Sequence, residues 1–208
     1  MAAVTTRIAR TKKEAVAQFR CGTILAAARA VFARKGFEAA LVDDIADEAG
    51  IAKGTVYLYF PSKKDIYLAA LVEEFQRFHE QTVEAVNAVV GAREKLRAFA
   101  EVGLTNCRSH GDFLRIYVSE FSNQIQDPSR KPKELANIHK KRVHHLTAII
   151  EAGIEAGEIK QVRPTAAAAT VFDVLKGMWH RQLLGQSGAS YRQELDFVLD
   201  FIWHGLAA

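Results

Sequence analysis

The sequence has few of the residues that interrupt helices or cross-link small domains. Its 208 residues include only 4 prolines and 13 glycines, so long helices can form without a break. It has only 2 cysteines, Cys21 and Cys107, which cannot make a disulfide framework in a chain of this length. We therefore expect a reduced, intracellular setting for this protein.

Long apolar runs and targeting signals are also missing. No uninterrupted apolar stretch approaches the roughly 18 residues of a membrane-spanning helix. Residues 1–18 are basic and contain no apolar signal-peptide core. The composition, with 49% hydrophobic and 25% charged residues, is that of a globular chain with one or two modules. These observations predict a cytoplasmic protein with no membrane partner.

Positive charge is concentrated near the N-terminus. Residues 1–64 contain 11 Lys and Arg against 6 Asp and Glu, whereas residues 65–208 contain 17 against 18. A basic third joined to a near-neutral remainder suggests an anionic partner for that third. The alternative is a solubilising tail.

Apolar residues recur at helical spacing, and no stretch shows the alternation of a strand. The first apolar stripe ends at Lys35-Gly36, a usual helix stop. It consists of Ile24, Leu25, Ala28, Val31 and Phe32. The pattern predicts an all-α chain of about nine helices. Those after the first are expected over residues 42–49, 53–60, 63–90, 92–109, 112–125, 132–156, 165–185 and 190–206.

Residues 42–61, VDDIADEAGIAKGTVYLYFP, have the pattern of a helix-turn-helix. Ala46 supplies the small residue where the second helix crosses the first, and Gly50 lies in the turn. Apolar residues stand where they would join both helices to the core, namely Ile45, Ala49, Ile51 and Val56. An ordinary helical hairpin is the alternative interpretation.

The second of these helices would enter the major groove of DNA by its N-terminal end. Lys53 can reach a phosphate or a guanine edge there. Gly54 permits close approach of the backbone to DNA. Thr55 offers a hydroxyl and a methyl group that can meet a thymine.

Three further residues suit contacts with the DNA backbone. Tyr57 and Tyr59 carry hydroxyls that can bond phosphate oxygens, although one of the two could be mainly structural. Lys63 lies at the N-terminus of the next helix, where backbone N–H groups also favour phosphate.

At this point the segment resembles a known family. GFEAALVDDIADEAGIAKGTVYLYFPSKKDIY, residues 36–67, is similar to the DNA-binding segment of the TetR family of bacterial repressors. The preceding FARKGF, Phe32–Phe37, fits the same pattern, and the specific resemblance covers residues 19–70. The resemblance implies homodimers that bind palindromic operators and are released by a small molecule. We accordingly divide the chain into a basic flexible arm (1–17), a helix-turn-helix domain (18–64) and a ligand-binding and dimerisation domain (65–208).

The sequence departs from the family pattern where Ser or Thr is usual. Ala40, Leu41 and Ala52 have no hydroxyl to cap a helix or touch a phosphate. Asp43 or Asp44 could serve the helix N-terminus by its charge instead. We predict that the N-terminal arm compensates on DNA, through Arg7, Arg10, Lys12 and Lys13. A tail without such contacts is the alternative.

The resemblance also implies a dimer interface and an effector pocket in the C-terminal bundle. The expected interface residues are Val171, Val174, Leu175, Met178, Leu195, Val198, Leu199 and Ile202, although the same stripe could be intramolecular core. The candidate pocket residues are Phe75, Phe78, His79, Phe113, Tyr117, Phe121, His145 and Trp179. Apolar walls with a few polar tips suggest an apolar or aromatic effector with a polar handle, but each residue could equally be plain core.

No metal, cofactor or enzyme activity is predicted. His139 lies five or six residues before His144 and His145, a poor spacing for ligands on one helix face. The basic residues nearby are expected to form a solvated face, with contact to an acidic ligand or DNA as the alternative. They are Arg130, Lys131, Lys133, Lys140, Lys141 and Arg142. Thiol sensing by Cys107 is a minor alternative, and no catalytic motif is present.

These observations together predict a ligand-responsive transcriptional regulator that acts as a homodimeric repressor on a palindromic operator. The rival interpretation is an all-α small-molecule-binding protein with weak or lost sequence-specific DNA binding. It is motivated by the missing hydroxyls at positions 40, 41 and 52.

Overall fold

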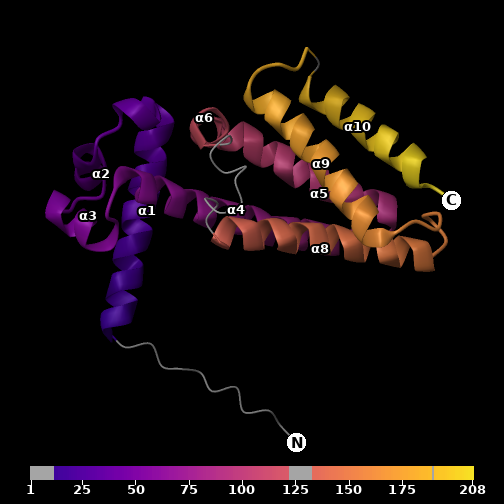
Figure 1. Ribbon diagram of the computed structural model, residues 1–208, viewed down its shortest axis with the longest axis horizontal. Helices are drawn as coiled ribbons and strands as arrows, with labels where there is room; N and C mark the ends of the chain where they lie inside the picture. Colours follow the sequence, from indigo (N-terminus) through magenta and orange to yellow (C-terminus); the bar gives the residue numbers. More distant parts are fainter. Residues whose placement is uncertain (1–11, 122–132, 189) are drawn as a thin grey trace, which may run out of the picture. The chain divides into compact units, whose positions relative to one another are not determined.

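The computed structural model describes residues 12–121, 133–188 and 190–208 (Figure 1). Arg7 and Arg10 of the predicted arm lie outside the described residues, as do the side chains of Lys12, Lys13 and Phe121. Within the described ranges the chain forms nine α-helices and no strand, apart from one isolated bridge between Ile159 and Ala207. The all-α prediction is confirmed.

The N-terminal helices are α1 (Lys12–Ala39), α2 (Val42–Glu48) and α3 (Lys53–Tyr59), followed by the long α4 (Lys63–Asn87). The remaining elements are α5 (Ala92–Ser109), α6 (Gly111–Ile116), the π-helical turn η1 (Tyr117–Phe121), α8 (Lys133–Glu155), α9 (Pro164–Leu183) and α10 (Tyr191–Leu206). The helix expected over 112–125 is described only as far as Phe121, and that part consists of α6 followed by the π-helical turn η1.

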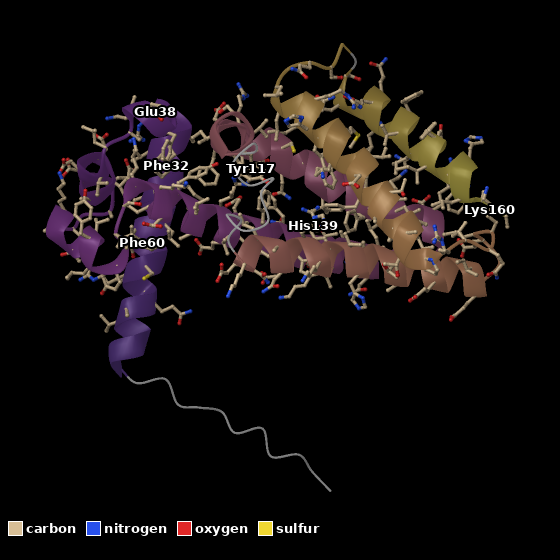
Figure 2. All side chains as sticks on the ribbon, in the orientation of Figure 1. Phe32, Glu38, Phe60, Tyr117, His139 and Lys160 are labelled. Atoms are coloured by element: carbon tan, nitrogen blue, oxygen red, sulfur yellow. The ribbon has the colours of Figure 1, made fainter. Side chains whose placement is uncertain are left out.

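The chain divides between Ala70 and Leu71 into two compact units. In the first unit, residues up to Ala70, the predicted stripe on α1 is buried, and Gly36 breaks the helix with φ of 76°. The ring of Phe32, labelled in Figure 2, meets the ring of Tyr67 edge-on at 5.4 Å. Residues 12–17, which we had assigned to a flexible arm, already belong to α1.

One described helix is long and apolar enough to span a membrane by length and composition alone, namely residues Ala15–Ala39 of α1. Its apolar residues are interrupted by Arg20 and Arg29, so it is not an uninterrupted apolar stretch of the kind that the sequence lacks. Core helices of soluble proteins pass the same test. Here Ile24, Ala28 and Val31 are fully buried, so this helix contributes its apolar face to the core of the first unit.

The second unit, from Leu71 onward, is a helical bundle centred on α5, α8, α9 and α10. Helix α8 packs along α9, and α5 contacts α8, α9 and α10; Figure 1 shows α9 and α10 running side by side. Ion pairs from Arg97 to Asp196 and from Arg93 to Asp200, each 2.9 Å long, also join α5 to α10. The bundle therefore has one continuous core.

The predicted dimer stripe lies largely inside this core. Seven of its residues, Val171, Leu175, Met178, Leu195, Val198, Leu199 and Ile202, are buried within the single chain, and Val174 is half-buried. Helix α10 exposes other apolar side chains, Phe197 (71% exposed) and Phe201 (67%). The choice of residues is therefore corrected, because packing against α5 and α9 uses the face that we had assigned to a partner.

Candidate DNA-binding and effector sites

The N-terminus of α2 is capped without a hydroxyl. Its N-cap residue is Leu41, whose backbone N–H donates to Asp44 Oδ2 at 3.0 Å. Lys35 Nζ lies 2.7 Å from Asp44 Oδ1, and the hydrogen bond from Lys35 holds the pKa of Asp44 below its usual range. Asp44 thus partly replaces the missing Ser or Thr, as the sequence suggested.

The turn between α2 and α3 is closed by backbone hydrogen bonds. Gly50 has φ of 64°, a left-handed conformation that favours glycine, and the N–H of Ile51 donates to Ala46 O at 3.0 Å. Ile45, Ala46 and Val56 are buried around this turn. Of the residues predicted to join these helices to the core, these three are buried, whereas Ala49 and Ile51 are half-buried.

The outer face of α3 carries the charged side chain of Lys53, the backbone of Gly54 without a side chain, and the ring of Tyr57. Lys53 Nζ pairs with Asp43 Oδ2 at 2.7 Å, and this hydrogen bond raises the pKa of Lys53. A Cβ placed on Gly54 would meet no described atom within 4 Å, so intramolecular packing does not require glycine there. Tyr57 is 46% exposed, whereas Thr55 and Tyr59 are half-buried. Of the two tyrosines, Tyr57 is the more available to a partner.

Lys63 has an intramolecular role. Its ammonium donates to the carbonyl oxygens of Phe37 (2.7 Å), Glu38 (3.1 Å) and Ala40 (3.1 Å). An ammonium has three donors, and all three are used here. The phosphate contact of Lys63 stays a prediction, since the ammonium would have to release one of these bonds to make it.

Several predicted pocket residues meet in the bundle. The ring of Phe75 lies 5.9 Å from Phe78 and 5.8 Å from Tyr117, which Figure 2 labels. His79 of α4 and His145 of α8 have ring centroids 6.2 Å apart. Phe113 is buried on α6, and burial raises the pKa of Tyr117.

A second group of rings surrounds Trp179. Phe172 lies 6.2 Å from Trp179 and 6.4 Å from Phe99, and the ring of His139, also labelled in Figure 2, lies 5.0 Å from Phe172. A Cβ on Gly103 of α5 would come within 2.3 Å of the Trp179 ring. Gly103 therefore permits the close approach of this indole to α5.

Arg142 of α8 lies at the centre of these rings. Its side chain is on the inner face of α8 and the residue is only 6% exposed, which corrects our assignment of Arg142 to a solvated face. Its Cζ lies 5.4 Å, 5.3 Å and 5.1 Å from the ring centroids of Phe99, Phe172 and Trp179. Burial lowers the pKa of Arg142 to about 10, which still leaves it charged at neutral pH.

Several buried nitrogen atoms around Arg142 lack a partner. Among the described residues, Nε and Nη2 of Arg142, Nε1 of Trp179, and Nδ1 of His79 and of His145 have no hydrogen-bond partner. Burial lowers the pKa of both histidines, and the charge of Arg142 lowers that of His79 further. The interior of the bundle thus contains a positive charge, and the nitrogens of Arg142 and Trp179 are donors without an acceptor among the described residues.

Neither a metal centre nor a reactive thiol is indicated in the described part of the chain. No group of three His, Cys, Asp or Glu residues there could hold a metal ion. Burial raises the pKa of Cys107 to about 12, so it is a neutral thiol at physiological pH.

Comparison with known proteins identifies the family. The family model for bacterial regulatory proteins of the tetR family matches residues 24–70, and the model for the tetracyclin repressor-like C-terminal domain matches residues 89–182. The fatty acid metabolism regulator protein of Bacillus subtilis is 31% identical over 138 residues, which cover 66% of this chain and 70% of that protein. This chain belongs to the TetR family.

Solved structures of similar proteins share the fold of this TetR-family chain. A transcriptional regulator from Saccharomonospora viridis in complex with choline has a TM-score of 0.78 and 23% identity, over 92% of this chain and 99% of that one. FadR from Bacillus subtilis in complex with stearoyl-CoA has a TM-score of 0.72 and 24% identity, over 88% and 98%. Choline and stearoyl-CoA are the ligands bound in those two proteins. The family assignment makes this chain a ligand-responsive, DNA-binding transcriptional regulator.

Sequence reasoning missed several residues of this TetR-family regulator. Leu58 is 81% exposed on α3, beside Tyr57. Arg142 occupies a place in the inner stripe of α8 with Leu135, Ile138 and Ile149, a spacing that could have revealed it. Phe99 and Phe172 lie at core positions of α5 and α9 and could not be told from ordinary core residues.

Proposed function

We propose that this chain is a cytoplasmic homodimeric repressor that binds a palindromic operator and is released by a lipophilic small molecule. The outer face of α3 supports this proposal most strongly. Gly54 has an open Cβ position that the packing of its own unit does not require, and Tyr57 is 46% exposed. The ring of Tyr57 and the backbone at Gly54 lie on the outer face of α3, where a recognition helix would approach the major groove of DNA.

Lys53, Gly54, Thr55, Tyr57, Tyr59 and Lys63 are the proposed DNA contacts. Lys53 would exchange Asp43 for a phosphate or a guanine edge, because its ion pair is exposed and therefore weak. Tyr57 would donate its hydroxyl to a phosphate oxygen. Arg7 and Arg10 would add contacts from the N-terminal arm.

Dimerisation is proposed through the exposed face of α10. Phe197 and Phe201 are four residues apart and therefore neighbours on one helix face. Two large exposed rings on a single face favour a contact with a second copy, in which the same patch serves both protomers. The buried stripe behind them would position α10 for this contact.

The effector is proposed to be a lipophilic molecule of the acyl class. The related B. subtilis protein is named as a fatty acid metabolism regulator, and the structural neighbour FadR holds stearoyl-CoA. The aromatic groups around Phe75 and Trp179 supply apolar walls for such a molecule. Helix α4 contributes Phe75 and Phe78, so binding would shift this helix and change the spacing of the two recognition helices. The effector acts only through its different affinities for the two states.

Selection of bound sequences from random duplex DNA tests this function. We expect recovery of a palindrome by the parent protein. A Lys53→Ala, Tyr57→Ala double variant should lose operator binding and keep its dimer, because both side chains lie outside the core. Binding that is salt-sensitive but independent of sequence would instead favour a small-molecule-binding protein without specific DNA recognition.

A further inference from the structure

The buried guanidinium of Arg142 is the feature of the bundle that the regulator's fold does not explain. A charge removed from water costs several kcal/mol in free energy unless it is paired. Three aromatic rings face Arg142, and each attracts its charge through a cation–π interaction. These rings do not satisfy Nε and Nη2, which have no hydrogen-bond partner among the described residues.

Arg142 and Trp179 both need a hydrogen-bond acceptor. Trp179 Nε1 can only donate a hydrogen bond, and Arg142 can only donate. In the described part of the chain no carboxylate forms an ion pair with Arg142, and no carboxylate is among the groups that shift its pKa. An anion with acceptor oxygens would satisfy both the charge and these donors.

We propose that the effector of this regulator carries a carboxylate, which pairs with Arg142 inside the bundle while its apolar body lies against Phe99, Phe172 and Trp179. This inference rests on the proposed effector-binding role of the bundle. A carboxylate matches the two free nitrogens, because a guanidinium binds it through two parallel hydrogen bonds.

The charge and burial of the site favour a free acid over a polyanionic conjugate. One buried arginine neutralises one negative charge, whereas a phosphate-rich group would keep further charges in an apolar interior. His79 and His145 complete the wall, and the pKa values of both are lowered, so neither is expected to supply a second positive charge at neutral pH. We therefore expect the acid to bind more tightly than its coenzyme A thioester or its alcohol.

Fluorescence can report on this site alone. The sequence has 2 tryptophans, Trp179 and Trp203, so Trp203→Phe leaves Trp179 as the single emitter. This parent is titrated, without DNA, with dodecanoate, hexadecanoate and 2-naphthoate, and with the alcohol of each acid. Dodecanoyl-CoA is titrated as well, to compare a coenzyme A thioester with the free acid. We expect at least one acid to change Trp179 emission and to bind roughly 10- to 100-fold more tightly than its alcohol, the range for hydrogen bonds to a charged group.

Arg142→Met is the decisive variant. It should bind acid and alcohol with equal affinity, because only the charge distinguishes them. Arg142→Lys serves as the fallback if the methionine variant does not fold. It keeps the charge but loses the two-pronged geometry, so it should weaken the acid about tenfold and leave the alcohol unchanged. Gly103→Ala is the steric control, since its Cβ would displace Trp179 and weaken acid and alcohol alike.

Ligand-free stability tests whether the chain supplies its own anion. Removing an unpaired buried charge should leave the Tm of ligand-free Arg142→Met equal to that of the parent or a few degrees higher. A lower Tm would show that groups of the chain itself already stabilise the charge of Arg142 in the ligand-free protein.

That result would overturn the proposal. So would a parent that prefers no acid in the panel, or an Arg142→Met variant that keeps the preference. Acid binding without operator release would contradict the proposed repressor function and leave this inference standing.

Discussion

The ammonium of Lys63 donates a 2.7 Å hydrogen bond to the carbonyl oxygen of Phe37 and lies 4.6 Å from the centroid of its ring. This contact joins the start of α4 to the end of α1 within the first unit. It gives a structural reason for a lysine at a position where the family resemblance implies a DNA contact.

Lys63→Met separates these two roles. We expect a lower Tm, because three backbone carbonyls lose their donor, a loss of about 1–3 kcal/mol in the free energy of unfolding. Operator affinity should be measured over a range of salt concentrations. The slope of its logarithm against that of salt should fall by about 0.9, because the proposed phosphate contact of Lys63 is lost, whereas an unchanged slope would limit Lys63 to its structural role. A reduced slope with an unchanged Tm would contradict the structural role.

Gly54→Ala should separate DNA contact from folding. The new Cβ meets no described atom within 4 Å, and alanine favours a helix over glycine by about 1 kcal/mol, so the Tm should be equal or higher. Operator affinity should fall about tenfold or more, since the methyl group would stand between α3 and the groove. Gly22→Ala on α1 is the matched control, with equally open space. Equal operator affinity in the two variants would mean that α3 does not approach DNA at this position.

A Phe197→Glu, Phe201→Glu double variant should be monomeric in light scattering. Both rings are exposed on α10, so the substitutions should leave the secondary structure unchanged. Charges of like sign would face each other across a symmetric contact. Val174→Ala on α9, which alters a half-buried residue of the original stripe, should remain dimeric. Retention of the dimer by the double variant would exclude this face as the interface.

The link between Glu194 and α9 predicts a pH dependence of stability. Burial opposes the charge of Glu194, but hydrogen bonds from Ser187, Arg181 and Gln182 outweigh it and lower its pKa. A lowered carboxyl pKa stabilises the fold above the unfolded pKa, and this contribution is lost as the pH falls through the folded value.

Glu194→Gln should therefore lower the Tm at pH 7, and the difference from the parent should shrink as the pH falls below about 4, the ordinary range of a Glu carboxyl. Thermal unfolding over pH 3–7 measures this. A difference that does not change with pH would show that the charge of Glu194 contributes nothing.

The sequence predicted the elements well because their signals are local. Gly36 and Gly50 both adopt positive φ at predicted ends or turns, and Pro164 begins α9 after a predicted break. The sequence offered Asp43 or Asp44 as a substitute at the start of α2, and the structure shows that Asp44 accepts the hydrogen bond from Leu41.

The predictions that were wrong concern residues whose burial or partners depend on tertiary packing, because the local sequence pattern fits more than one arrangement. Helix α10 is apolar on two faces, and only contact with α5 and α9 determines that Leu199 is buried and Phe197 is exposed. Arg142 was grouped with the exposed Lys140 and Lys141 by charge, although the helical period places it on the opposite face. The three acceptors of Lys63 lie on a segment more than twenty residues earlier, which no local pattern reveals.

The spacing of the two operator half-sites tests the central claim most directly. Once a palindrome has been selected, about 5 base pairs, roughly half a helical turn, are inserted between its halves, and the affinity of the full-length protein is measured. A homodimer that reads both halves should lose affinity by about 100-fold or more, because only one recognition helix can then bind. Unchanged affinity for the lengthened site would contradict the account.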